Sequence, residues 1–213
     1  MPDSKKNILS HSKMTLTAPK LPNGSYPPKF KVQTYNNNVQ FAIFTGLDNS
    51  GVINAGMDPI TFYTVLTMIE RMIKEPTPAK DEVITYKVEN DQGRGKDKAL
   101  KSTTVIGKDS EGVLFISVLS TDSSMPKVKF NFNTDYYHRI SIPGVSKATV
   151  SELAAQAWVD ALRVIMGVHL TTTYEPVVFN GGGNNNRSNN NNNNGGGGFN
   201  HSESPTTDGD IPW

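Results

Sequence analysis

The chain has 213 residues, of which 36% are hydrophobic, and its 21 basic and 20 acidic residues give a net charge of +1. It contains no cysteine, which excludes disulfides, thiolate metal ligands and a cysteine nucleophile. No apolar run is long enough to predict a membrane span, and residues 1–6 lack the apolar stretch of a signal peptide, so we expect a cytoplasmic protein.

Residues 1–28 are predicted to form a flexible, basic N-terminal arm. Its second half holds four prolines, which block regular structure: Pro19, Pro22, Pro27 and Pro28. Four lysines stand against the single acid Asp3: Lys5, Lys6, Lys13 and Lys20. Such an arm is either a solvated leader or a segment that contacts a polyanion.

The next segment predicts three strands and a helix. Phe30–Tyr35, Val39–Thr45 and Val52–Ala55 have the composition and alternation of strands, and the asparagines between the first two predict a turn. A helix then runs from Asp58 to about Lys74, because Asp58 suits the N-cap and the following proline suits the first helical position.

The second half repeats this plan with more strands. The predicted strands are Val83–Val88, Ser102–Gly107, Val113–Leu119, Lys127–Phe132 and Tyr137–Ile142. A second helix is predicted from about Thr149 to Met166, since Thr149 and Glu152 have capping-box spacing and Gly167 suits the C-terminal cap.

Residues 176–213 are predicted to be a disordered linker, because the run from Gly181 to Gly198 is almost entirely glycine and asparagine. They hold one basic and three acidic residues, which leaves the remainder of the chain mildly basic. The chain therefore divides into an arm (1–28), a folded domain (29–175) and a linker (176–213) with an acidic tip at 208–213.

The tip resembles the C-terminal tail of bacterial and phage single-stranded DNA-binding proteins. It combines two carboxylates with an Ile-Pro-aromatic ending: Asp208, Asp210, Ile211, Pro212 and Trp213. The resemblance implies that these residues dock into pockets on replication or recombination proteins such as a polymerase, helicase or primase. The tip departs from the family ending in two respects, because Trp213 stands for the usual phenylalanine and Gly209 interrupts the acidic run.

The predicted element order, in which a set of strands followed by one helix occurs twice, resembles that of the PC4/Whirly-like single-stranded nucleic-acid binders. The segment from Val39 to Phe62, with its Asp-Pro step into the helix, carries this resemblance. It implies an α+β fold in which two strands-then-helix repeats form curved antiparallel sheets packed on two helices, and it also implies a homo-oligomer. An elaborated OB-fold β-barrel is the alternative, although the strand and helix counts favour the two-repeat fold.

Catalysis finds little support in the sequence. The four histidines are scattered without metal-ligand spacing, and Gly93–Lys96 lacks the spacer of a phosphate-binding loop. No Gly-x-Ser-x-Gly elbow is present. We therefore expect no enzyme activity, no cofactor and no metal site.

Single-strand binding instead requires cations and aromatic rings on one face of a sheet. The two-residue period of each strand assigns one side to the core and the other to solvent. The predicted DNA-binding set consists of outward residues together with the basic stretch 92–101: Lys31, Tyr35, Phe44, Lys87, Arg94, Lys96, Lys98, Lys101, Phe115, Lys127, Lys129, Tyr137 and Arg139. Phe115 and Tyr35 are the sharpest candidates for base stacking, because each is an aromatic opposite an apolar stripe.

The sequence thus predicts a sequence-independent single-stranded DNA-binding protein of DNA replication or recombination, with a viral origin favoured by this pairing of body and tail. Two alternatives stay open: an RNA-binding or transcription-cofactor protein of the same fold class, and a scaffolding protein whose open sheet face binds another protein.

Overall fold

The computed structural model describes residues 9, 14–35, 37–47, 51–92, 96, 98–132 and 142–172, all within a compact unit spanning Met1–Pro176. The second unit, Val177–Trp213, lies outside the described residues, and with it most of the predicted linker and the whole tip.

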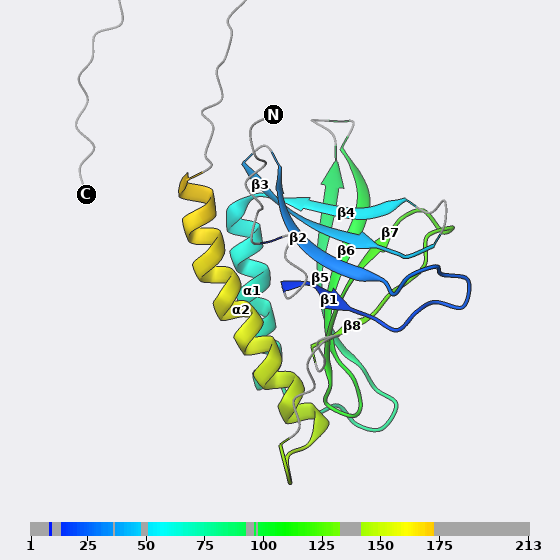
Figure 1. The fold of residues 1–213 in the computed structure, drawn as a ribbon, viewed down its shortest axis with the longest axis vertical. Coiled ribbons are helices and arrows are strands. Elements are labelled where there is room, and N and C mark those ends of the chain that lie inside the picture. Colours follow the sequence, from blue (N-terminus) through cyan, green and yellow to red (C-terminus); the bar gives the residue numbers. More distant parts are fainter. Residues whose placement is uncertain are drawn as a thin grey trace, which may run out of the picture. The chain divides into compact units, whose positions relative to one another are not determined.

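Four antiparallel strands form the first sheet in chain order, and a helix follows them (Figure 1). They are β1 (Leu16–Thr17), β2 (Lys29–Tyr35), β3 (Asn38–Phe44) and β4 (Val52–Met57), and the helix α1 spans Pro59–Lys74. Asn37 has a φ of 60° in the turn between β2 and β3, a conformation that asparagine tolerates better than most residues. The three predicted strands and their turn are confirmed, with ends that differ by one or two residues.

The start of α1 is also as predicted. Asp58 is the N-cap, and its carboxylate accepts hydrogen bonds from the Thr61 backbone N–H at 2.9 Å and the Thr61 hydroxyl at 2.6 Å. Pro59 occupies the first turn, where a missing N–H costs nothing. The helix ends at Lys74, and Glu75 is its C-cap, with the next proline following directly.

The second sheet is again antiparallel and in chain order, and again a helix follows it. Its strands are β5 (Ile84–Gln92), β6 (Ala99–Lys108), β7 (Leu114–Ser120) and β8 (Phe130–Asn131), and the helix α2 spans Lys147–Thr172. Gly112 has a φ of 78° in the turn between β6 and β7, which suits glycine.

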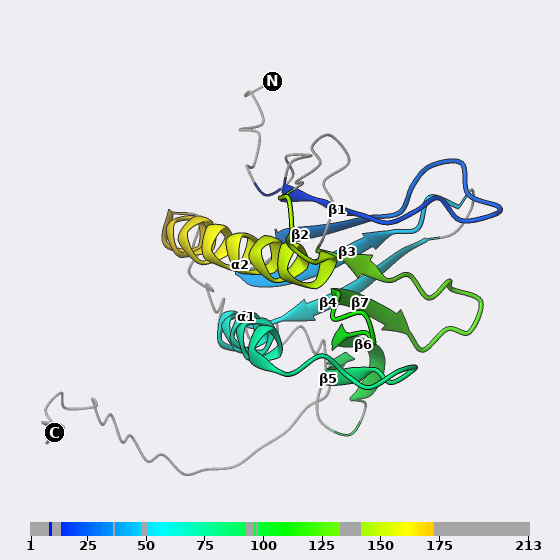
Figure 2. The same cartoon turned by 90° about the horizontal axis from the view of Figure 1, so that it is seen from below.

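The two helices lie side by side and pack against the sheets, α1 against β3 and β6 and α2 against β7 (Figure 2). Rings from both repeats meet in one core, where Phe30 of β2 contacts Phe41, Phe130 and Trp158 with centroid distances of 5.0, 5.6 and 6.2 Å. The protein is therefore α+β, with two four-stranded antiparallel sheets and two helices. Within the described residues the sheets are separate, unlike the single closed barrel of the alternative OB-fold.

The second helix is longer than predicted at both ends. Its N-terminal cap is Ser146, whose hydroxyl accepts the Thr149 backbone N–H at 3.1 Å, so the prediction of Thr149 as the cap is wrong. Gly167 lies inside the helix rather than at its C-terminal cap. The helix continues through this glycine because neighbouring residues such as Met166 remain packed in the core.

The prolines of the N-terminal arm predicted a segment without regular structure, and this prediction is wrong for part of the arm. Leu16–Thr17 pairs with β2, and Leu9 and Ala18 are buried. The predicted strand Lys127–Phe132 shortens to the two residues of β8, and of the predicted strand Tyr137–Ile142 only Ile142 lies among the described residues.

A buried lysine joins three elements on the inner side of the second sheet. Lys108, the last residue of β6, is 2% exposed, and its Nζ donates to the backbone oxygens of Glu75 at 2.7 Å and Ile73 at 3.4 Å. The same Nζ lies 2.8 Å from the Glu152 carboxylate of α2. A cation at the end of α1 satisfies carbonyls that have no partner in the helix and complements its dipole. Lys108 therefore fixes both helices to the sheet.

We predict that Lys108→Met lowers the free energy of unfolding by about 2–3 kcal/mol. This value lies below the usual cost of about 3–5 kcal/mol for removing one partner of a buried pair, because the Glu152 carboxylate still reaches solvent. Urea unfolding followed by circular dichroism measures it. Lys80→Met is the matched control, since Lys80 is exposed in a loop, and should change stability by less than about 0.5 kcal/mol. Equal midpoints for the two variants would contradict the assigned role.

Candidate nucleic-acid interface

The first sheet presents one face to the core and the other outward. On β2, Phe30 and Val32 are buried, whereas Lys29 and Tyr35 are exposed and Lys31 is half-buried. The strand register carries the outward face across β3 and β4. We call this the open face of the first sheet, and its residues are Lys29, Lys31, Gln33, Tyr35, Asn38, Gln40, Ala42, Phe44, Val52, Asn54 and Gly56.

The open face carries cations and no acid. Lys29 pairs with Phe44 in register, and Phe44 pairs with Val52 on the next strand. Lys31 Nζ lies 4.8 Å from the Phe44 ring centroid, within cation–π range. Ala42 lies on this face but is buried, because the longer side chains of Lys31 and Asn54 flank it in register.

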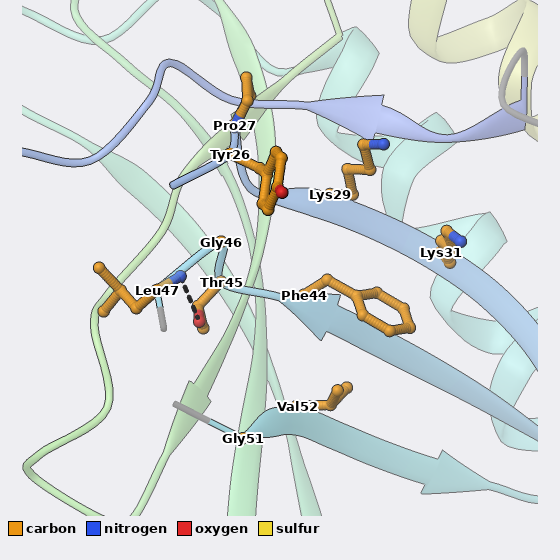
Figure 3. Close-up of a pocket in the computed structure, with 10 residues that line it drawn as sticks. All are labelled: Tyr26, Pro27, Lys29, Lys31, Phe44, Thr45, Gly46, Leu47, Gly51 and Val52. Atoms are coloured by element: carbon orange, nitrogen blue, oxygen red, sulfur yellow. Dashed lines mark hydrogen bonds between the residues drawn. The ribbon is translucent and has the colours of Figure 1, made fainter. Parts of the chain in front are cut away.

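A groove of about 320 Å³ lies at one end of the open face (Figure 3). Side chains from β2, β3 and β4 line it together with the loops that precede β2 and follow β3. We call it the Phe44 groove, and its residues are Tyr26, Pro27, Lys29, Lys31, Phe44, Thr45, Gly46, Leu47, Gly51 and Val52. Its volume is at the small end of the range for ligand pockets. The groove combines two aromatic rings with two lysines, the side chains that stack on bases and neutralise phosphates.

The wall of the groove depends on a close backbone crossing. The Gly46 oxygen accepts the backbone N–H of Ser25 at 2.7 Å and that of Tyr26 at 3.2 Å. Gly46 has a φ of 73°, and a Cβ there would lie 1.9 Å from the Tyr26 backbone oxygen. Only glycine fits this crossing, which holds Tyr26 beside the groove with its side chain 69% exposed.

The equivalent face of the second sheet is covered at β7. Phe115 points away from the core-facing Leu114 and Ile116, as predicted, but it is 5% exposed. Its ring lies over Gly107, where a Cβ would come within 2.3 Å of Phe115 Cζ, and Lys129 Nζ lies 4.4 Å from the ring centroid. The expectation of an exposed Phe115 ring is therefore wrong.

Ser117 lies on the same side of β7 as Phe115, and it is buried as well. Its hydroxyl donates to the Val128 backbone oxygen at 2.6 Å, so the segment before β8 lies against this side of β7. A base therefore has no free ring to stack on at this part of the second sheet.

The other predicted cations are spread over the surface. Lys87, Lys96, Lys101, Lys127 and Lys129 are exposed. Lys98 is exposed too, but it forms an ion pair with Asp91 at 3.0 Å. Several predicted site residues lie outside the described residues: Arg94, Tyr137, Arg139, Asp208, Asp210, Ile211, Pro212 and Trp213.

The structure brings Lys31 and Phe44 together and adds two residues that sequence reasoning missed. Lys29 was absent from the predicted DNA-binding set because the predicted strand began at Phe30, one residue after the true start of β2. The two-residue spacing of Lys29 and Lys31 could have shown that both lie on the same face of the strand. Tyr26 follows Gly-Ser and precedes two prolines, and no local pattern reveals its contact with Gly46.

Shifted pKa values occur at local hydrogen bonds. The Thr61 hydroxyl lowers the pKa of Asp58 and the Ser124 hydroxyl lowers that of Asp122, while the bond that Tyr86 donates to Glu75 raises the pKa of Tyr86. These groups lie at a helix cap, a turn and a strand–helix contact. Within the described part of the chain, no three His, Asp or Glu side chains gather to form a metal site.

Comparison of the chain with family models, with curated proteins and with solved structures finds no match.

We predict that Gly46→Ala destabilises the protein by about 1–3 kcal/mol and displaces Tyr26, because the new Cβ overlaps backbone atoms and requires a left-handed conformation. Gly56→Ala on β4 is the control, since a Cβ there meets nothing within 4 Å. Urea midpoints of the two variants provide the measurement. A Gly46→Ala protein as stable as Gly56→Ala would show that the crossing does not constrain the groove.

Proposed function

We propose that this protein binds single-stranded DNA along the open face of the first sheet, in the manner of the PC4/Whirly-like proteins. The observation that supports this most is the Phe44 groove, in which Lys29 and Lys31 stand beside the rings of Phe44 and Tyr26. Each base stacked on an aromatic side chain contributes about 1–3 kcal/mol, and every base has a face to stack. Binding by stacking and by phosphate contacts therefore requires no particular sequence.

The proposed biological role is the coating of exposed strands during DNA replication or recombination, in a viral setting and in the cytoplasm of the host. The chain would perform no chemistry on the strand. The tip at 208–213 would recruit a polymerase, helicase or primase, by its similarity to the tails of single-stranded DNA-binding proteins. Its aromatic and aliphatic side chains suit an apolar pocket and its carboxylates suit a basic rim.

We expect the full chain to bind oligo-dT at low salt, with an affinity that Phe44→Leu reduces about 5- to 10-fold. Leucine keeps apolar bulk on β3 but removes the flat ring on which a base stacks. Lys31→Ala should weaken binding and reduce the slope of log K against log salt by about 0.7, the value of one phosphate contact on a single strand. Fluorescence anisotropy at several salt concentrations gives both quantities.

Two exposed residues away from the groove supply the controls. Val83→Ala and Lys80→Ala should leave affinity and salt slope unchanged. The same titration with oligo-U separates the DNA-binding function from the RNA-binding alternative. Absence of any binding to oligo-dT and oligo-U at low salt would contradict the proposal and favour a scaffolding role.

The proposal also includes a homo-oligomer built through α2. By length and composition this helix would pass as a membrane span, as core helices of soluble proteins also do. Its outer side exposes Leu153, Val164 and Val168 at 53%, 70% and 61%. Their spacings of eleven and four residues place them on one side of the helix, where Ala157 and the exposed Asp160 also lie. A largely apolar surface of this kind suits the packing of a second copy.

We predict that the wild-type chain is a dimer or larger in solution and that Val164→Glu shifts it towards monomer, because a charge in an apolar contact has no partner. Size-exclusion chromatography with light scattering measures the mass. Lys80→Glu, an equal gain in negative charge at an exposed loop position, should not change it. A monomeric wild-type chain at every concentration would refute this assembly.

A further inference from the structure

Three amide side chains occupy the middle of the open face. Gln33 of β2 is the register partner of Gln40 on β3, and Asn54 of β4 pairs with Ala42, one position along the same face from Gln40. On one side of these amides lies the Phe44 groove, and on the other lies Tyr35 at the end of β2, 69% exposed. A DNA strand that runs along β2 and β3 from Phe44 to Tyr35 must cross this amide row.

The central amide is held in place. Gln40 Nε2 donates to Asn54 Oδ1 at 2.6 Å, which limits the rotation of both side chains. Among the described residues, Asn54 is the hydrogen-bond partner of the Gln40 side chain. The bond leaves the second Nε2 hydrogen and Oε1 of Gln40, a donor and an acceptor in one plane, for a ligand.

The surroundings suit a nucleobase. Gln40 is also the register partner of Gly56, where a Cβ would meet nothing within 4 Å, so the sheet surface beside the amide is open. The open face has two lysines and no acid, which complements a polyanion. A fixed donor–acceptor pair can therefore meet the edge of a base whose phosphates lie near Lys29 and Lys31.

We propose that the amide row reads adenine, so that the protein binds every single strand but holds adenine-containing strands more tightly. This inference rests on the proposed binding of single strands. In the major groove of duplex DNA an Asn or Gln amide pairs with adenine through two bonds, donating to N7 and accepting from the N6 amine, and a good pair discriminates by about 1–3 kcal/mol. For a single strand on an amide row that is open to solvent, we expect roughly a 3- to 10-fold preference, around the weak end of that range.

The experiment compares wild-type binding to three 12-nucleotide strands that do not pair with themselves: oligo-dC, the same strand with adenine at every third position, and the same strand with thymine there. The adenine strand should bind 3- to 10-fold more tightly than the thymine strand. Because purines also stack more strongly, a fourth strand replaces adenine with unsubstituted purine, which lacks the N6 amine. That strand should lose most of the preference.

Gln40→Met should abolish the adenine preference and leave the salt slope unchanged, because methionine has a similar length and no charge but lacks the amide. Gln92→Met is the matched control and should keep the preference, since position 92 lies on β5 of the other sheet. Equal binding of the adenine and thymine strands, or a preference that survives in Gln40→Met, would overturn the inference but leave single-strand binding intact. Absence of binding to all four strands would overturn both proposals.

Discussion

The ion pair and hydrogen bonds of Lys108 hold the two halves of the molecule in one arrangement. A lysine that is 2% exposed is stable only if its charge is satisfied, and here two backbone oxygens at the end of α1 and the Glu152 carboxylate of α2 do so. The contact docks the end of one helix and the start of the other onto the last residue of β6. With the helices fixed there, the inner faces of the sheets are closed, and function is left to their outer faces.

The outer faces of the two sheets carry similar residues but differ in how exposed those residues are. Each carries a phenylalanine beside a lysine, with Lys31 over Phe44 in the first sheet and Lys129 over Phe115 in the second. In the first sheet the pair borders an open groove, whereas in the second the ring lies over Gly107 and is buried. A repeated architecture has therefore produced one accessible platform, and the absence of a side chain at Gly107 leaves the room that the other ring occupies against its own sheet.

Much of this fold follows from local rules that the sequence displays. The alternation of β2 assigned its faces correctly, and the Asp58–Pro59 step located the start of α1. What the sequence did not show depends on contacts between distant segments. Lys108 is the last residue of a strand and precedes a turn, so nothing local marks it as buried, and the burial of Phe115 depends on Gly107 and Lys129. Tyr26 is held at the candidate site by its contact with Gly46, twenty residues further along the chain. The N-terminal cap of α2 is Ser146 rather than the predicted Thr149, because the Ser146 hydroxyl accepts the Thr149 backbone N–H.

The proposed binding site is tested most directly by finding where single-stranded DNA lies on the protein. Ultraviolet cross-linking of the full chain to an oligo-dT strand carrying 5-iodouracil, followed by mass spectrometry, identifies the aromatic residues that touch the bases. We predict cross-links at Phe44 and Tyr35 of the first sheet and at Tyr26 in the loop before β2. Cross-links confined to the second sheet, at or around Phe115, would contradict it, because that ring is buried in the structure described.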